Sequence, residues 1–101
     1  MGEGNPNVSE AILTTKNALI CKSPAILIDV TISGDGANGD CDVYDGENTF
    51  GDKKAHLEVL SGTSCSWKPT CGVRINNGIY IVVNASTTNV SVSFIPLERH
   101  E

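Results

Sequence analysis

The stretch Ala25–Ser33, A-I-L-I-D-V-T-I-S, decides the fold because its polarity alternates with a period of two. On an extended strand, successive side chains point to opposite faces. One face would carry the apolar residues Ile26, Ile28, Val30 and Ile32. The other would carry the mainly polar residues Leu27, Asp29, Thr31 and Ser33. The pattern predicts a half-buried strand whose isoleucines and Val30 face the core.

The same alternation occurs further along the chain. It predicts that Ala55, Leu57 and Val59 point inward from one strand, and that Val90, Val92 and Phe94 point inward from another. The stretch Ile79–Val83, I-Y-I-V-V, is apolar on both faces and predicts a central strand buried on both sides. Shorter strands fit at Asn17–Lys22, Cys41–Tyr44, Ser64–Trp67 and Val73–Ile75.

Turn-forming residues separate these stretches. Gly34–Gly39 predicts a hairpin turn, Asp45-Gly46 the exit turn of the next strand, and Asn77-Gly78 a tight turn. About eight short strands at this spacing predict an all-β fold, a single antiparallel β-sandwich of jelly-roll-like or Ig-like type. We expect residues 1–8 to be a flexible N-terminal arm, residues 9–97 the sandwich and residues 98–101 a polar tail.

Composition excludes several functions. The 101-residue chain has a net charge of −5, and its seven basic residues are scattered, so neither nucleic acid nor an anionic membrane surface is an expected partner. No apolar run reaches the roughly 18 residues of a membrane-spanning helix. The N-terminus carries no basic residue and no apolar stretch, so no secretory signal is expected.

The four cysteines, Cys21, Cys41, Cys65 and Cys71, do not have the spacing of a zinc site. Free, buried thiols are the favoured interpretation because no export signal is visible and reducing compartments keep thiols reduced. A Cys65–Cys71 disulfide across the segment C-S-W-K-P-T-C stays open as the alternative.

The segment Ser33–Asn48 is rich in Asp, Asn and Gly, as calcium loops are. An EF-hand register that begins at Asn38 places Val43 where glycine is required and Thr49 where glutamate is required, so it fails. We interpret the segment as turns around a short strand. A weak surface calcium site formed by Asp35, Asn38 and Asp40 is the alternative, and no metal or other cofactor is predicted.

The sequence contains no convincing catalytic set. His56 and His100 are the only histidines, and no serine is singled out as a nucleophile. Asp42 and Asp45 could suggest glycosidase chemistry, but a sandwich of this size offers little room for a sugar cleft. We therefore expect no enzyme activity. Sugar binding through exposed aromatic rings is a better alternative, and Trp67 and Phe50 are its candidate residues.

Residues 17–96 resemble small β-sandwich virion proteins of tailed bacteriophages. The resemblance rests on the long strand at Ala25–Ser33, the turn D-V-Y-D-G (residues 42–46) and the stretch G-V-R-I-N-N-G-I-Y-I-V-V (residues 72–83). The segment C-S-W-K-P-T-C and the N-terminal arm depart from the pattern. No functional residue is established for the group, so none is transferred.

The resemblance implies a non-catalytic structural protein located in the virion and assembled in the host cytoplasm. Such a protein decorates or cements the capsid or the head–tail region through sheet edges, loops and the N-terminal arm. The implied partners are the major capsid protein or other virion proteins, and a homo-oligomer is expected. The alternative is a carbohydrate- or receptor-binding module of a fibre.

Overall fold

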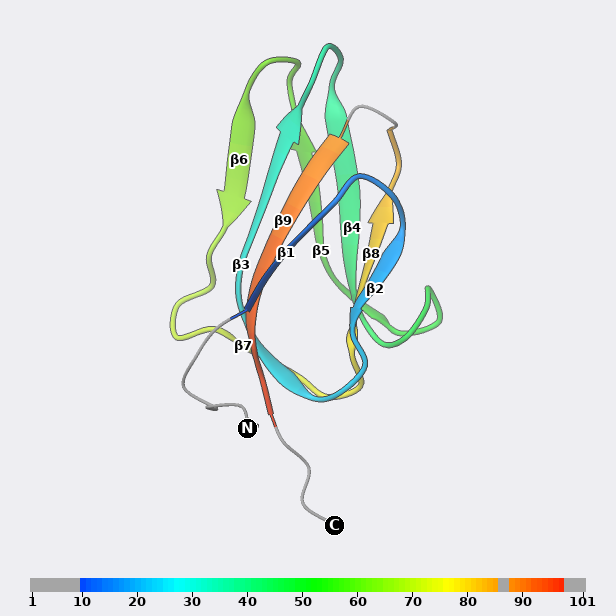
Figure 1. Ribbon diagram of the computed structural model, residues 1–101, viewed down its shortest axis with the longest axis vertical. Helices are drawn as coiled ribbons and strands as arrows, with labels where there is room; N and C mark the ends of the chain where they lie inside the picture. Colours follow the sequence, from blue (N-terminus) through cyan, green and yellow to red (C-terminus); the bar gives the residue numbers. More distant parts are fainter. Residues whose placement is uncertain (1–9, 86–87, 98–101) are drawn as a thin grey trace.

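The computed structural model describes residues 10–85 and 88–97 of the chain. Its nine strands form two antiparallel sheets packed face to face, which confirms the predicted all-β sandwich (Figure 1). The arm predicted at residues 1–8 and the tail predicted at residues 98–101 lie outside the described residues.

Each sheet combines strands that are distant in sequence. The first sheet has the order β1 (Glu10–Thr14), β9 (Thr88–Pro96), β3 (Ala25–Gly34) and β6 (Ser64–Trp67), and β7 (Val73–Ile75) also pairs with β3. The second sheet has the order β2 (Ala18–Cys21), β8 (Ile79–Val83), β4 (Gly39–Asp45) and β5 (Asp52–Val59). The strand that the sequence pattern did not predict is β1, which lies at the edge of its sheet and has no buried face to produce a clear alternation.

The inner faces of the two sheets form one apolar core. The largest apolar side chains that are fully buried are Leu27, Val30, Ile32, Val43, Ile75, Ile79, Ile81, Val90 and Val92. Leu57, Val59 and Phe94 are also buried, and Ala55 packs against the core, so the predicted inward faces of β5 and β9 are confirmed.

The predicted faces of β3 are wrong in the first half of the strand. Leu27 is fully buried, whereas Ile26 and Ile28 are only partly buried. The register with β9 explains the difference, because Leu27 pairs with Phe94 while Asp29 already pairs with Ser93. Ile28 is therefore the extra residue of a β-bulge. A bulge reverses the alternation on one side of it, so the prediction holds only for the second half of the strand.

The prediction for Ile79–Val83 is correct for its position and wrong for its burial. β8 pairs with β2 on one side and with β4 on the other, so it is central in its sheet. Ile79 and Ile81 are fully buried, but Tyr80 and Val82 are only partly buried. They lie on the outer face of a two-layer sandwich, which no further sheet covers in the described part of the chain.

Two of the predicted turns connect the two sheets, so the hairpin predicted at Gly34–Gly39 is wrong. The segment Gly34–Gly39 leads from β3 in the first sheet to β4 in the second, and Asn77-Gly78 leads from β7 to β8 in the same way. The β4–β5 connection, which begins at the predicted exit turn Asp45-Gly46, is a hairpin. Its turn is tight, because a Cβ atom on Gly51 would lie 2.2 Å from the carbonyl oxygen of Asp45.

Candidate functional site

Four ionisable side chains gather on the outer face of the β4–β5 hairpin. β4 contributes Asp40 and Asp42, and β5 contributes His56 and Glu58. The antiparallel register places Asp40 opposite Glu58 and Asp42 opposite His56. Residues two apart on a strand share a face, so the alternation that sends Cys41 and Leu57 into the core sends these four residues outward.

His56 is the centre of this cluster. Its Nδ1 lies 2.5 Å from Asp42 Oδ1, and its Nε2 lies 2.9 Å from Glu58 Oε2. Asp40 Oδ1 is 3.6 Å from the same Nε2. Asp42 is almost completely buried, whereas 43% of the His56 side chain is exposed. The imidazole ring therefore rests on a buried carboxylate and presents its other nitrogen to two further carboxylates.

Asp42 is held from several sides. Asn84 donates hydrogen bonds from Nδ2 to Asp42 Oδ2 at 3.1 Å and to Asp40 Oδ1 at 3.0 Å. The Nζ atom of Lys53 lies 3.5 Å from Asp42 Oδ1. A register shift after Val43 brings Lys53, rather than Lys54, opposite Tyr44 and so toward the cluster. These contacts leave the Asp42 carboxylate with little freedom to rotate.

The cluster changes the pKa values of two groups. Burial acts to raise the pKa of Asp42, but hydrogen bonds from His56 and Asn84 and the charge of Lys53 outweigh it, so the pKa is lowered. Hydrogen bonds to Glu58 and Asp42, aided by the charge of Asp40, raise the pKa of His56 to about 9. His56 is therefore an imidazolium at neutral pH and cannot serve there as a general base.

We expect the stabilisation provided by His56 to be present below about pH 6.5 and to be lost as the pH rises toward 9. The folded-state pKa of about 9 exceeds the ordinary value of 6.5, so the folded protein binds this proton more tightly than the unfolded chain does. The free energy of unfolding, measured in urea between about pH 6 and 10 with a chelator present to remove stray metal ions, should decline in this way in the wild type and not in His56→Gln. A pH-independent difference between the two proteins would contradict the assignment.

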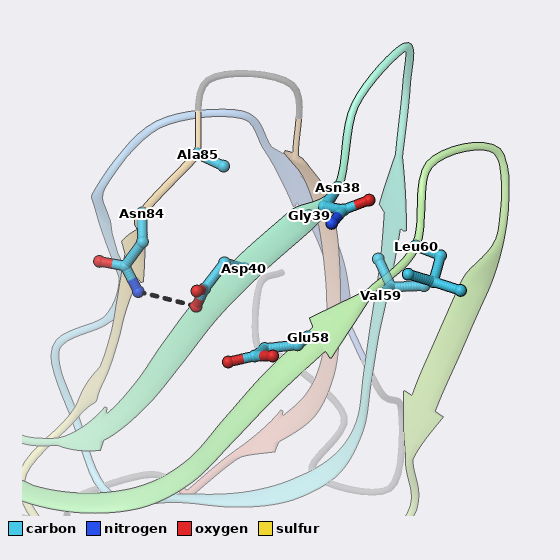
Figure 2. Close-up of a pocket in the computed structure, with 8 residues that line it drawn as sticks. All are labelled: Asn38, Gly39, Asp40, Glu58, Val59, Leu60, Asn84 and Ala85. Carbon is cyan, nitrogen blue, oxygen red and sulfur yellow. Dashed lines mark hydrogen bonds between the residues drawn. The ribbon is translucent and has the colours of Figure 1, made fainter.

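A pocket of about 400 Å³ opens beside the cluster. Figure 2 shows Asp40 and Glu58 on its walls, with Asn84 bonded to Asp40. The full lining is Asn38, Gly39, Asp40, Glu58, Val59, Leu60, Asn84 and Ala85. Two carboxylates and two amides make this pocket suited to cations or to ligands rich in hydrogen-bond donors.

The residues of the predicted calcium alternative have different surroundings. Asp35 lines a second hollow, with Ser33, Thr63 and Ser64 among its neighbours. Asn38 accepts a hydrogen bond from the Ser61 N–H at 3.0 Å. Asp40 faces Asn84 and His56. Among the His, Cys, Asp and Glu side chains of the described residues, Asp40, His56 and Glu58 form a group whose donor atoms converge closely enough for a metal ion.

Of the two aromatic candidates for sugar binding, one lies in a turn and the other on β6. Phe50, in the β4–β5 turn, is 95% exposed. Trp67 lies opposite Val30 on β3 and is partly buried against the core. Neither ring lines the pocket beside His56.

All four cysteines are free thiols in this structure, and the Cys65–Cys71 disulfide is not formed. Cys21 and Cys41 are buried, Cys65 is partly buried and Cys71 is exposed. Burial, together with the charges of Asp42 and Asp40, raises the pKa of Cys41 to about 12. The Cys41 thiol is therefore unreactive at neutral pH.

Sequence reasoning considered His56, Asp40 and Asp42 separately and did not identify Glu58 or Asn84 as their partners. A signal was present in the matching spacings D-C-D at residues 40–42 and H-L-E at residues 56–58. Each places two polar side chains on one face of a strand. Recognising the cluster also requires the pairing register between the two strands, and the spacing of residues within each strand does not specify that register.

No model of a known protein family matches this chain, and a search of curated proteins finds no relative. Among the described residues, no helix has the length and apolar character needed to cross a membrane. The fold and the site therefore define the protein as a small two-sheet β-sandwich with a charged histidine–carboxylate cluster on one hairpin.

Proposed function

We propose that this sandwich is a non-catalytic structural protein of a phage virion, which decorates or cements the capsid or the head–tail region. The proposal joins the resemblance of residues 17–96 to small virion proteins with one observation. Phe50 presents an apolar aromatic ring to solvent on a well-defined turn, with 95% of its surface exposed. Aromatic side chains that fill a pocket on a partner dominate the energy of many interfaces.

The turn that carries Phe50 is organised before any partner binds. The Phe50 N–H donates to Asn48 Oδ1 at 2.8 Å, and the Gly51 N–H donates to the Asn48 carbonyl at 3.2 Å. At the base of the turn, the Gly46 N–H donates to the carbonyl of Gly78 at 2.9 Å. A turn ordered in this way loses little conformational entropy on binding, which favours association.

A second exposed apolar residue lies at the other end of the same hairpin. Leu60, just after β5, is 69% exposed. It lies at the end of the hairpin where Val59 pairs with Gly39, whereas Phe50 lies at the end where Asp52 pairs with Asp45. Contacts at both ends suit a module that bridges two neighbouring subunits. In a symmetric particle each weak contact is repeated many times, so avidity accumulates. The proposed partners are the major capsid protein or other virion proteins, and the module would also form a homo-oligomer.

The exposed ring of Phe50 also favours a second function, a carbohydrate- or receptor-binding module of a fibre. Aromatic rings stack on the apolar faces of sugars, and one fully exposed ring can supply such a contact. In that case the turn would recognise a glycan instead of a virion protein.

The test is co-sedimentation with phage particles that lack this protein. Phe50→Ala should weaken particle binding at least about tenfold. Glu47→Ala, on the same turn and also exposed, is the matched control and should bind like the wild type. Both variants should keep the wild-type melting temperature, because Phe50 contributes no buried area to the fold. Light scattering on the free protein measures the oligomeric state.

Wild-type protein that does not sediment with particles, and that stays monomeric, would contradict the structural role. Glycan-array binding that Phe50→Ala abolishes and Glu47→Ala preserves would instead support the fibre module. Particle binding that is equal for both variants would show that the Phe50 turn is not the contact.

A further inference from the structure

The geometry points to a site for a first-row divalent transition metal of the zinc class, formed by Asp40, His56 and Glu58. One donor atom from each residue lies within 4.8 Å of the other two. Zinc bonds to nitrogen and oxygen are about 2.0–2.2 Å long, which separates neighbouring donors of a tetrahedral ion by about 3.3 Å. The distances from His56 Nε2 to Glu58 Oε2 and to Asp40 Oδ1 are 2.9 and 3.6 Å, one on each side of that value.

The orientation of His56 is the second observation. Its Nδ1 is engaged by the buried Asp42 at 2.5 Å, so Nε2 is the nitrogen that faces the two other donors. Histidines that bind metals commonly give their second ring N–H to a carboxylate in this way, which fixes the ring and makes the ligating nitrogen more basic. Asp42 would thus be a positioning residue. Asn84 holds Asp42 through Oδ2 and Asp40 through Oδ1.

The charges of the cluster also favour a divalent cation. Three carboxylates (Asp40, Asp42 and Glu58) lie around the His56 ring, and Lys53 contacts one of them, Asp42. Because Lys53 contacts Asp42, a divalent ion bound between the other two carboxylates would balance the charges of Asp40 and Glu58. Lys53 lies on the Asp42 side of the ring, 3.5 Å from Asp42 Oδ1, and is not one of the three donors.

The chemistry of the donors decides the class of metal. An imidazole nitrogen with two carboxylate oxygens suits zinc, cobalt or nickel, whereas calcium and magnesium prefer oxygen donors alone. Asp40 and Glu58 also line the pocket of about 400 Å³. The remaining coordination position would open toward this pocket, where water or a donor from another molecule can complete the shell. Because β4 and β5 both supply ligands, the ion would also fasten the edge strand β5 to its sheet.

Isothermal titration of chelator-treated full-length protein with zinc chloride tests the site. We expect one zinc ion per chain and a higher melting temperature in its presence. His56→Gln and Glu58→Gln should each weaken binding at least about 100-fold, because each removes a ligand. Asp42→Asn should weaken it about 10- to 100-fold and change the visible spectrum of the cobalt-loaded protein, while Asp42→Glu should restore part of the affinity.

Three matched controls separate this site from other zinc ligands in the chain. Glu47→Gln removes an exposed carboxylate at the far end of the hairpin, Cys71→Ser removes the exposed thiol, and His100→Gln removes the second histidine. All three should bind zinc like the wild type. Zinc binding that survives His56→Gln, or that is lost in Cys71→Ser or His100→Gln, would overturn the proposal. So would calcium binding as tightly as zinc. The comparison of Phe50→Ala with Glu47→Ala in the phage-particle assay is independent of these results, because the turn that carries both residues lies at the opposite end of β5.

Discussion

Leu27→Ala should lower the free energy of unfolding by about 3 kcal/mol, whereas Ile28→Ala should lower it by less than about 1 kcal/mol. Leu27 is fully buried in the core, and removing its methyl groups leaves a cavity that the surrounding strands cannot close. Ile28 is the extra residue of the bulge in β3 and is only partly buried. The two substitutions are adjacent, so the contrast between them reports directly on the bulge.

Urea denaturation followed by tryptophan fluorescence measures both values, with Trp67 as the single reporter. Val30→Ala, on the other side of the bulge, is a further comparison and should be costly because Val30 is fully buried. Uninterrupted alternation from Ile26 to Ile32 would give the opposite order, with Ile28→Ala more damaging than Leu27→Ala. That order would show that the bulge is absent in solution.

Asp45→Ala should lower the free energy of unfolding by about 2–3 kcal/mol. Asp45 ends β4 and is only 4% exposed. Its Oδ1 accepts the Asn77 N–H at 2.8 Å, and its two oxygens accept the Asn76 N–H at 3.2 and 3.1 Å. This carboxylate holds the connection between β7 and β8, where the chain crosses from one sheet to the other. Without it, two backbone donors lose their partner in a partly buried environment.

Hydrogen exchange gives a second measurement for this prediction, because the amide protons of Asn76 and Asn77 should lose protection selectively in Asp45→Ala. Asp52→Ala is the matched control. Asp52 pairs with Asp45 in the register but is exposed, so its loss should change stability by less than about 0.5 kcal/mol. Equal effects of the two substitutions would show that the contacts of Asp45 contribute nothing beyond removal of a negative charge.

The two strands whose faces were predicted correctly keep an unbroken alternation through their core-facing residues. In β9, Val90, Val92 and Phe94 are all buried, and in β5 the same holds for Leu57 and Val59. Here the pattern of the chain and the requirement to bury one face coincide. In β3 the pattern is equally regular, yet one inserted residue moves Leu27 inward and Ile28 out of the core. The bulge arises from the pairing of β3 with β9, and no feature of the local sequence indicates it.

In the candidate site too, the sequence shows one part of the arrangement and the strand pairing decides the rest. The polar spacing of Asp40 and Asp42, and of His56 and Glu58, is visible in the sequence as two residues on one face of each strand. The charge of His56 depends on which carboxylates reach its two nitrogens, and that is set by the register between β4 and β5. Asn84 joins the cluster from the end of β8, more than 40 residues away from Asp40.

By itself, the sequence determined that the chain folds as an all-β sandwich, because strands that alternate with a period of two, where no helix is predicted to cover them, bury their apolar faces by packing sheet on sheet. It also determined the exit turn of β4 at Asp45-Gly46, because these residue types favour tight turns. That this turn closes a hairpin, while the shorter β3–β4 and β7–β8 connections cross between the sheets, was decided by the tertiary structure. The tertiary structure alone decided which connections cross between sheets, where β3 bulges, and that His56 meets three carboxylates. Each of these depends on pairing between residues distant in sequence, and no local pattern of polarity specifies such pairing.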